Sequence, residues 1–465
     1  MWFRRDLRLD DNPALAAAVQ ASGGNVICLY VREPGLEPDL GGASKWWLDK
    51  SLRALADQIE SLGGQLVLRQ GDARRVLDDV IDGSGAKAVF WNRRYDLSGR
   101  ETDKAIKADL KTRGVVTDSY NGSVLTEPWT QTTGSGGYYK VFSPYWRSVQ
   151  AQYEAPCAIP APKRLSSSTL DSDALDDWHL HPHRPDWSTG FDLDWTPGAI
   201  GAQERLSAFL NGPVSTYSDD RDRPDLATGT SGLSPHLAFG EISPAQIWRA
   251  TQTRMAAGTV TEREGLKFLS ELVWRDFSYV LLFHNPRLAV ENYKTDFDLM
   301  PWRTDNTALS AWQRGETGYP MVDAGMRQLW TTGWMHNRVR MIVASFLTKH
   351  LLIDWREGEK WFWDTLVDAD PASNSASWQW TAGCGADAAP YFRVFNPITQ
   401  GEKFDRTGNY VRTWCPELAR LPQKYLHKPW DAGPLILREA GVTLGQTYPH
   451  PIIDHKTGRQ RALDA

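Results

Sequence analysis

The sequence predicts an α/β domain with a doubly wound, Rossmann-like parallel sheet, followed by an all-α domain. Three observations point to this fold class. First, 465 residues are more than a single ordinary hydrophobic core usually organises. Second, short runs rich in β-branched and aromatic residues alternate with helical stretches over the first 120 residues. Third, beyond residue 201 apolar residues recur at i, i+3 and i+4, which is the spacing of helices.

The N-terminal domain is expected to span residues 1–120. Apolar runs such as NVICLYV and AVFWN predict strands at 25–31, 65–69, 88–92 and 115–120. The stretch 45–63, KWWLDKSLRALADQIESLG, is predicted to be an amphipathic helix between two of these strands. Because helical stretches connect successive strands, the strands are expected to run parallel.

Two further segments follow the N-terminal domain. Residues 121–195 are rich in Pro, Ser, Gly and Asp and show little periodicity, so we expect an interdomain linker that runs along the surface. Residues 196–465 are expected to form the helical domain, with its clearest helices at 263–283, 322–350 and 356–367. No internal repeat is evident in the sequence.

Composition favours a globular protein that does not enter a membrane. Hydrophobic residues make up 41% of the chain and charged residues 23%. No apolar run reaches the roughly 18 residues that a membrane span requires. The N-terminus has no signal-peptide layout, so we expect a cytoplasmic protein, and we expect it to be a monomer.

Cysteine and histidine do not form a metal-ligand or redox pattern. The four cysteines lie far apart and are expected to be buried free thiols: Cys28, Cys157, Cys384 and Cys415. Three histidines occur at i, i+2 spacing in a Pro- and Asp-rich stretch, which favours a solvated loop: His179, His181 and His183. We therefore expect no metal site.

Charge is unevenly distributed along the chain. The formal net charge of −5 argues against a general polyanion binder. The segment 391–465 nevertheless holds 11 Lys or Arg against 7 Asp or Glu. This local positive balance permits a surface that faces phosphate groups.

The stretch 333–380 is the most informative part of the chain. It reads GWMHNRVRM, then LLIDWREGEKWFW, then LVDADPASNSASWQW. Trp at such density is usually core, but here it is interleaved with groups that hydrogen-bond a planar heterocycle: Asn337, Arg340, Asp368, Asp370 and Asn374. We therefore expect a flavin as the bound group.

Motifs over nearly the whole chain closely resemble the photolyase/cryptochrome flavoproteins, and within them the bacterial class I cyclobutane pyrimidine dimer (CPD) DNA photolyases. Besides the Trp-rich stretch, these motifs are WFRRDLRLDDNPAL, GTSGLSPHLAFGEIS, ELVWRDF and APYFRVFNPITQGEKFD. The resemblance implies the same two-domain fold with FAD in the helical domain. It also implies light-driven repair of UV-damaged DNA, in which reduced FAD gives an electron to the dimer and the cyclobutane ring opens.

One departure from the family is visible at the N-terminus. In the family a short apolar strand runs directly into WFRRDLRL, whereas here only Met1 precedes Trp2. We therefore expect a truncated first strand. If that strand is central, part of the hydrogen-bonding ladder on its two neighbours would be left unpaired.

The resemblance assigns the phosphate side of FAD to GTSGLSPHL at 229–237, where hydroxyls and free amides precede a helix. Gly232 stands where the family often has a basic residue. On the flavin side, Asn337 and Arg340 flank the isoalloxazine, Arg340 pairs with Asp368, and Asp370 bonds ribityl or ring-edge groups. The cofactor set implied by the resemblance is Tyr217, Thr230, Ser231, Gly232, Leu233, Ser234, Asn337, Arg340, Asp368, Ala369, Asp370 and Asn374.

The resemblance also places Asn374 opposite flavin N5, where plant cryptochromes carry Asp. A neutral amide can donate to or accept from N5 as its protonation changes. Trp378, Trp355 and Trp302 match, from the flavin outward, the family's Trp chain for photoreduction. Together with Glu271, these four residues form the set to which the resemblance assigns catalysis.

The lesion pocket is predicted on the helix 263–283. Glu271, Trp274, Arg275 and Ser278 fall at i, i+3, i+4 and i+7 and share one stripe. Apolar flanks predict a partly desolvated Glu271 whose protonated carboxyl donates to a pyrimidine carbonyl. By resemblance, Trp274 and Trp380 stack on the flipped dimer and Met341 completes the pocket. The full substrate and DNA set is Arg221, Glu271, Trp274, Arg275, Asn337, Arg338, Met341, Trp380, Arg393 and Gln400.

Three other functions fit parts of the sequence. A cryptochrome-type blue-light photoreceptor would keep the same fold. A (6-4) photolyase needs a His pair near the pocket, where this chain has Asn337 and Met341. A flavoenzyme without photochemistry or DNA would leave the matched lesion pocket unexplained.

A second antenna chromophore, either a deazaflavin or methenyltetrahydrofolate, is a further expectation from the family. The acidic-amide pair of folate-binding relatives has no counterpart at 96–103. Lys45, Trp46 and Trp47 either line a second-chromophore cleft or simply begin an amphipathic helix.

Overall fold

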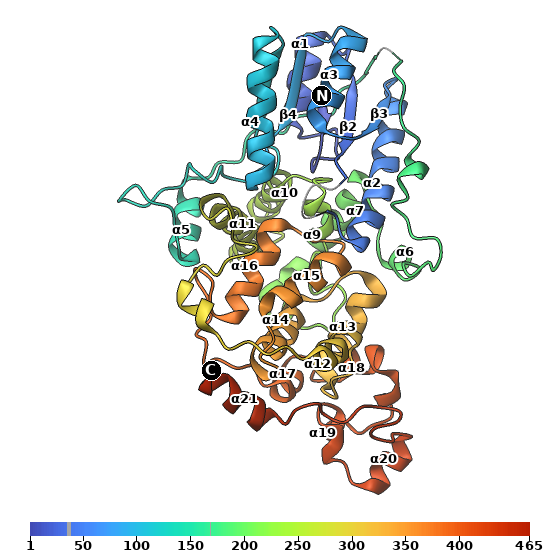
Figure 1. Ribbon diagram of the computed structural model, residues 1–465, viewed down its shortest axis with the longest axis vertical. Helices are drawn as coiled ribbons and strands as arrows, with labels where there is room; N and C mark the ends of the chain where they lie inside the picture. Colours follow the sequence, from blue (N-terminus) through green and yellow to red (C-terminus); the bar gives the residue numbers. More distant parts are fainter. Residues whose placement is uncertain (35–38, 168) are drawn as a thin grey trace.

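The computed structural model describes residues 1–34, 39–167 and 169–465. An α/β domain lies at one end of the elongated molecule and a helical domain at the other (Figure 1). The expected fold class is thus confirmed.

The described part of the α/β domain contains a five-stranded sheet in the order β3-β2-β1-β4-β5, with every pair parallel. The strands are β1 (Trp2–Phe3), β2 (Cys28–Arg32), β3 (Leu66–Gln70), β4 (Ala88–Asn92) and β5 (Val116–Tyr120). The connecting helices are α1 (Pro13–Ser22), α2 (Gly42–Ser61), α3 (Ala73–Ser84) and α4 (Leu97–Thr112). The predicted strands and the predicted helix at 45–63 therefore all occur, with small shifts of their ends.

Successive strand residues pack on opposite faces of the sheet. Phe3 and Cys28 join a core with α1 and α2, whereas Trp2 and Leu29 join a second core with α3 and α4. This alternation is the period of two that a strand buried on both faces requires. The sheet is therefore doubly wound, as expected.

The first strand is central but only two residues long. Trp2 pairs with Leu29 of β2 and Trp91 of β4, and Phe3 pairs with Tyr30. Met1 continues the ladder towards β2, because its amino group donates to the Ile27 carbonyl at 2.9 Å and its carbonyl accepts from Leu29 N–H at 2.9 Å. The expected short first strand is confirmed, and Met1 satisfies part of the neighbouring ladder.

The connection over 121–195 is more ordered than predicted. It contains α5 (Phe142–Gln152), η1 (Leu175–Trp178) and α6 (Phe191–Asp194). Phe142, Tyr145 and Val149 are buried at i, i+3 and i+7, and they join the core that also holds α11. The expectation of a purely irregular linker is therefore wrong over 142–152, since this stretch has a helical apolar face.

The helical domain places its elements around two cores. Its first half consists of α7 (Ala199–Leu210), η2 (Pro213–Thr216), α8 (Tyr217–Asp220), α9 (Ser234–Ala238), α10 (Pro244–Ala256), α11 (Glu262–His284), η3 (Thr295–Leu299), α12 (Asn306–Arg314) and α13 (Pro320–Thr332). The second half consists of α14 (Asn337–Ser345), the π-helix η4 (Phe346–His350), α15 (Trp355–Thr365), α16 (Pro371–Ala382), α17 (Pro397–Phe404), α18 (Asn409–Trp414), η5 (Pro416–Leu418), α19 (Gln423–Leu426), η6 (Pro429–Asp431), α20 (Pro434–Ala440) and α21 (His455–Asp464).

The single helix expected over 322–350 is wrong, because the chain breaks between α13 and α14. Gly333 ends α13 with a φ of 68°, a conformation that glycine adopts without steric cost. His336 then caps α14, since its ring Nδ1 accepts from Arg338 N–H at 3.1 Å. The break gives α14 an N-terminus of its own, at the residues expected to contact the flavin.

Arg8 joins the two domains. Its guanidinium is fully buried and donates to the carbonyls of Gly240 at 2.8 Å, Gly122 at 2.7 Å and Asp11 at 2.9 Å. Gly240 belongs to the helical domain and Gly122 to the connection, so one side chain contacts three parts of the chain.

Trp46 and Trp47 are fully buried at this joint. Trp47 Nε1 donates to Glu241 Oε1 at 3.0 Å, and Trp46 packs edge-on against Phe191. Lys45 forms an ion pair with Asp39 at 2.9 Å. Because Trp46 and Trp47 are fully buried in α2, neither lines an open second-chromophore cleft, and the helix interpretation is confirmed; Lys45 is half-exposed. The antenna itself stays a prediction.

Three of the four cysteines, Cys28, Cys384 and Cys415, are buried as expected. Cys157 is exposed, so the expected burial is wrong there; all four thiols are free. Among the described residues, no three His, Cys, Asp or Glu side chains are grouped in a way that could hold a metal ion.

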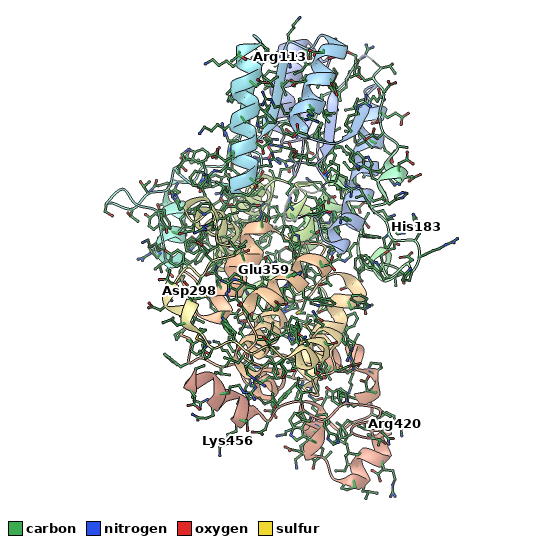
Figure 2. All side chains as sticks on the ribbon, viewed as in Figure 1. Arg113, His183, Asp298, Glu359, Arg420 and Lys456 are labelled. Atoms are coloured by element: carbon green, nitrogen blue, oxygen red, sulfur yellow. The ribbon has the colours of Figure 1, made fainter. Side chains whose placement is uncertain are left out.

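His179 and His183 are exposed in a loop, and His183 projects from the edge of the molecule (Figure 2). The expected solvated loop is confirmed at these two positions. Within residues 1–34, 39–167 and 169–465, no helix is long and apolar enough to cross a membrane.

Candidate functional site

A cavity of about 550 Å³ lies inside the helical domain. Its walls come from α8, α9, α11, α14 and α16. Of these, α9, α11, α14 and α16 lie in the middle of the molecule (Figure 1). Residues of the predicted cofactor, lesion and catalytic sets line it: Tyr217, Arg221, Thr230, Ser231, Leu233, Ser234, Glu271, Trp274, Arg275, Asn337, Arg338, Arg340, Met341, Asp368, Ala369, Asp370, Asn374, Trp378 and Trp380. The predicted residues outside this lining are Gly232, Trp302, Trp355, Arg393 and Gln400.

The ion pair between Arg340 and Asp368 is confirmed. Arg340 donates two parallel hydrogen bonds to the carboxylate, at 3.1 and 2.8 Å, and a third to the Met335 carbonyl at 2.7 Å. Ser234 Oγ also donates to Asp368, at 2.6 Å. The carboxylate is thus neutralised and hydrogen-bonded, which a buried charge requires. A guanidinium held in this way presents fixed positive charge to the cavity.

Asp370 lines the cavity and also fixes the start of α16. One carboxylate oxygen accepts from the N–H groups of Ala372 at 3.0 Å and Ser373 at 2.8 Å, so Asp370 is the helix N-cap. The other oxygen accepts from the Tyr279 hydroxyl at 2.6 Å. Both oxygens thus have partners in the protein, and this arrangement aligns α16 along the cavity.

Asn374 lies on α16 and is oriented by Glu359 of α15. Asn374 Nδ2 donates to Glu359 Oε1 at 2.9 Å and to the Glu359 carbonyl at 3.1 Å. Because these bonds occupy the amide nitrogen, Oδ1 is the polar atom that Asn374 can offer to a bound ring.

Glu359 was not expected from the sequence. It lies in the middle of the molecule (Figure 2), and its Oε1 also accepts from Ser375 Oγ at 3.3 Å. Burial raises the pKa of Glu359 to about 7, and the hydrogen bonds from Ser375 and Asn374 oppose this rise. A carboxyl that titrates near neutral pH therefore lies behind the residue expected to face N5.

The loop before α9 carries hydroxyls and amides into the cavity, as expected for a phosphate site. Gly232 has a φ of 62°, and a Cβ there would lie 2.6 Å from Arg205 Nη1. Arg205 extends from α7 and stacks over Trp195 at 4.3 Å. A guanidinium thus lies beside Gly232, but Arg205 does not line the cavity and donates to the Asp194 carbonyl.

The stripe on α11 faces the cavity, but two of its residues have other surroundings than predicted. Glu271 accepts hydrogen bonds from Arg221 and, at 3.0 Å, from Lys267. The expected apolar environment of Glu271 is therefore wrong, because two cations contact its carboxyl. Lys267 at i−4 was a visible signal in the sequence.

Arg275 lines the cavity, but its guanidinium is bound to other parts of the protein. Its guanidinium donates to the carbonyls of Ser123 and Leu237 and lies 4.9 Å from the Tyr279 ring. It thereby connects α11 to the linker and to α9. A direct DNA contact by Arg275 is not supported by this geometry.

The three Trp residues of the expected electron chain occupy one core. Trp378 lines the cavity, and its ring lies 5.0 Å from Phe362 and 6.1 Å from Trp312. Trp355 is fully buried in the same core, and Trp302 packs against that core from a partly exposed position. The structure thus brings together side chains that are up to 76 residues apart in the sequence.

Positive and aromatic side chains form one part of the rim. Arg338 donates to Asp222 at 2.7 Å and its guanidinium lies 4.5 Å from the Phe404 ring. Lys403 lies over the same ring at 4.9 Å. Lys403 is exposed and follows Gln400 by one turn of α17, so it extends the predicted DNA-facing set by a residue that sequence reasoning missed.

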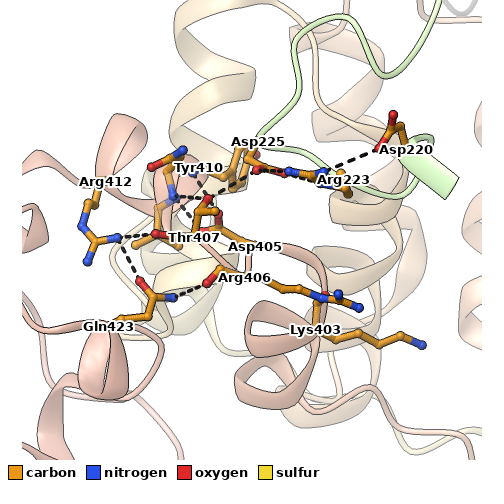
Figure 3. Close-up of polar contacts among 12 residues, drawn as sticks. Asp220, Arg223, Asp225, Lys403, Asp405, Arg406, Thr407, Tyr410, Arg412 and Gln423 are labelled. Atoms are coloured by element: carbon orange, nitrogen blue, oxygen red, sulfur yellow. Dashed lines mark hydrogen bonds and ion pairs between the residues drawn. The ribbon is translucent and has the colours of Figure 1, made fainter. Parts of the chain in front are cut away.

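A polar network fixes this rim, and Figure 3 shows it joining the loop at 220–225 to the segment 403–412. Asp225 accepts from Arg223 at 2.8 Å and from Thr407 Oγ1 at 3.3 Å. Asp405 is fully buried and accepts from two backbone N–H groups at 3.0 Å each. The side chain of Lys403 points away from this network (Figure 3).

Arg393 lies on the loop between α16 and α17. Its side chain is exposed, and its carbonyl accepts from Lys349 Nζ at 3.0 Å. Lys349 is buried, and this burial lowers its pKa to about 8. Arg393 is thus exposed to solvent on a loop whose backbone is hydrogen-bonded to buried Lys349.

Comparison with known proteins agrees with this site. A family model described as DNA photolyase matches residues 1–163, and one described as the FAD binding domain of DNA photolyase matches residues 268–465. Deoxyribodipyrimidine photo-lyase of Agrobacterium fabrum is 53% identical over 100% of this chain and 96% of its own length. The chain belongs to the photolyase/cryptochrome family.

Two further relatives place the chain within this family. The crystal structure of a bacterial class III photolyase from Agrobacterium tumefaciens superposes with a TM-score of 0.97, at 53% identity, and covers 100% of this chain and 95% of that one. Cryptochrome-1 of Arabidopsis thaliana is 38% identical over 100% of this chain and 69% of its own length. The class I assignment stays a prediction, and the similarity to a class III photolyase does not support it.

The photolyase FAD-binding domain accounts for the cavity, and the residues present fit FAD. The hydroxyls and amides before α9 suit a pyrophosphate, and the Arg340–Asp368 pair places fixed charge beside them. Asn374 offers a polar atom, while Phe362 and Trp378 provide flat apolar surface. FAD is thus the cofactor, and the residues expected to hold it share one enclosure.

Proposed function

We propose that this photolyase-family protein is a light-driven lyase that splits cyclobutane pyrimidine dimers in UV-damaged DNA. One observation carries the proposal: the cavity that fits FAD is also lined by Glu271, Trp274, Met341 and Trp380. Residues for a cofactor and residues for a flipped aromatic lesion thus share a single enclosure. When bound and reduced, FAD supplies one electron on excitation by light and takes it back after the ring opens.

The side chains of this protein would bind and orient the two partners. Trp274 and Trp380 offer indole faces on which extruded pyrimidines can stack. Arg338, Arg393 and Lys403 would contact phosphates around the cavity mouth. Arg338 lines the cavity, Lys403 shares the Phe404 ring with it, and Arg393 is exposed on the loop that follows Asp387 of the lining. These contacts would position the DNA without reading its sequence.

Charge within the cavity would be controlled by ion pairs. Arg340 would stabilise negative charge on the cofactor, while Asp368 keeps the guanidinium in place. Glu271 would hold Arg221 and Lys267 at the lesion side, so that their positive charge meets the dimer as electron density moves onto it. This role replaces the hydrogen-bond donation expected for Glu271.

Trp378, Trp355 and Trp302 would carry electrons from the surface to oxidised FAD and take no part in ring opening. The supporting feature is their common core, which begins at the cavity with Trp378 and reaches partly exposed Trp302.

A DNA substrate also agrees with the cytoplasmic location expected from the sequence.

A cryptochrome-type photoreceptor is the second candidate, because Arabidopsis Cryptochrome-1 matches the whole chain at 38% identity. Asn374 favours the lyase, since it offers a neutral amide where Asp is expected in plant cryptochromes. The Agrobacterium photo-lyase at 53% identity points the same way.

The decisive experiment exposes chemically reduced holoenzyme and a thymine-dimer oligonucleotide to blue light, with a dark sample as control. We expect dimers to disappear only in the light, in both single- and double-stranded DNA. A (6-4) photoproduct in the same sequence is expected to persist. Persistence of the thymine dimer under saturating light would refute the proposal and favour the photoreceptor.

A further inference from the structure

Trp274 is covered on one face by a residue of the connecting segment. The rings of Phe142 and Trp274 are parallel to within 8°, with their centroids 3.6 Å apart. Phe277 packs edge-on against both rings, at 6.0 and 5.9 Å. Trp274 and Phe277 line the cavity, and Phe142 is buried behind them on α5. The face of Trp274 that remains for a ligand is therefore the one opposite Phe142.

Asp387 holds Phe142 in this place. Phe142 is the first residue of α5, and its backbone N–H donates to Asp387 Oδ2 at 3.0 Å. No side chain within α5 caps this end of the helix, and Asp387 supplies negative charge to it from another segment. Asp387 itself lines the cavity and follows Trp380 by seven residues.

A second aromatic stack attaches the residues just before α5 to α11. Tyr138 lies parallel to His284, with centroids 4.4 Å apart and an angle of 5°, and its hydroxyl contacts the Tyr293 hydroxyl at 3.2 Å. His284 and Trp274 both belong to α11. The segment 138–142 is thus attached to α11 at two points ten residues apart.

We propose that Phe142 and Asp387 are positioning residues that fix the orientation of Trp274 relative to Trp380, and thereby the selectivity of the cavity for a flipped pyrimidine dimer. This inference rests on the proposed function. An indole that is free on both faces can rotate about its side-chain bonds, and binding a base must then stop that rotation. Stacking on Phe142 removes this freedom before the ligand arrives.

The hydrogen bond between Phe142 and Asp387 extends this effect across the cavity. Trp274 is held through Phe142, and Trp380 belongs to the segment that leads into Asp387. Loss of the hydrogen bond from Phe142 N–H to Asp387 should therefore alter the separation between the Trp274 and Trp380 rings. The connecting segment, which joins the domains, thus also forms part of the lesion site.

The test compares Phe142→Ala, Phe142→Tyr and Trp274→Ala holoenzymes for affinity to dimer-containing and undamaged DNA. We expect Phe142→Ala to weaken dimer binding about 2- to 10-fold, the range for loss of one aromatic pair, and to leave undamaged DNA unaffected. Phe142→Tyr keeps the ring and should behave like wild type. In a Trp274→Ala background, Phe142→Ala should cause no further loss, because Phe142 acts through Trp274.

Asp387 offers a matched pair of variants. Asp387→Ala removes the acceptor for Phe142 N–H and should lower dimer selectivity, whereas Asp387→Asn retains an acceptor and should keep most of it. If Phe142→Ala does not fold, Phe142→Leu retains bulk without the stack and takes its place.

A measurement without DNA separates this inference from the proposed function. The ¹⁹F resonance of 5-fluorotryptophan at position 274, assigned by Trp274→Phe, should be single in wild type and shifted or split in Phe142→Ala. If wild type shows no dimer selectivity but the resonance is single in wild type and shifted or split in Phe142→Ala, the lyase proposal and the role in selectivity fail, whereas the positioning of Trp274 by Phe142 stands. An unchanged resonance, or additive losses in the double variant, would overturn the positioning role.

Discussion

Replacing Glu359 with Gln should make the protein more stable, and by an amount that grows with pH. Burial raises the pKa of Glu359 from an ordinary value of 4.5 to about 7. Between these values the unfolded chain has released a proton that the folded chain still holds, so the free energy of unfolding falls as pH rises. Above pH 7 both states are ionised and the loss stays constant.

The magnitude follows from the two pKa values. Between pH 5 and pH 8 wild type should lose about 2.5 kcal/mol through this carboxyl, at about 1.4 kcal/mol for each tenfold change in proton affinity. Glu359→Gln keeps the shape and an acceptor for Asn374, and it does not titrate. Its stability advantage over wild type should therefore increase by about 2.5 kcal/mol across that range.

Urea unfolding followed by Trp fluorescence measures this difference, in FAD-free proteins so that cofactor affinity does not enter. Glu357→Gln changes an exposed Glu on the same helix and serves as the control. A Glu359→Gln advantage that stays level from pH 5 to pH 8 would show that the folded protein does not hold this proton, and the burial argument would fail.

Four further outcomes are expected. Trp378→Phe should block light-driven reduction of oxidised FAD and spare repair by chemically reduced enzyme, with exposed Trp129→Phe as the control; equal loss of both activities would contradict the electron-chain role. Trp274→Ala should weaken dimer binding by about 1–3 kcal/mol beyond any effect on undamaged DNA, and equal losses on both DNAs would remove it from the lesion wall. Arg393→Ala should weaken both DNAs and reduce the slope of affinity against salt, which a titration from low to high salt measures. Asp368→Ala leaves Arg340 without its partner and should cost about 3 kcal/mol in urea unfolding, together with loss of bound FAD.

The parts of the site that the sequence predicts are those whose signals are local or belong to a family motif. The strand at 88–92 and the helix ending at His284 follow from runs of residues that decide their own secondary structure. The pairing of Arg340 with Asp368 came from the family resemblance, because spacing alone cannot bring residues 28 apart together.

Other features of the site depend on contacts between segments that lie far apart in the sequence. Glu359 precedes exposed Lys360 in the sequence, and only the packing of α15 on α16 makes it half-buried. Glu271 was expected in apolar surroundings because its immediate neighbours are apolar, yet Arg221, 50 residues away, contacts it. Phe142 lies in a stretch of weak pattern whose role appears only when it stacks on Trp274.

Arg8 couples the unfolding of the two domains. Its buried guanidinium donates to carbonyls of both domains and of the segment between them, so separating the domains would leave Nη1 without its acceptor, the Gly240 carbonyl. Neither domain can then open without destabilising the other. Calorimetry should show one cooperative transition, and a fragment ending before Gly240 should contain a less stable α/β domain.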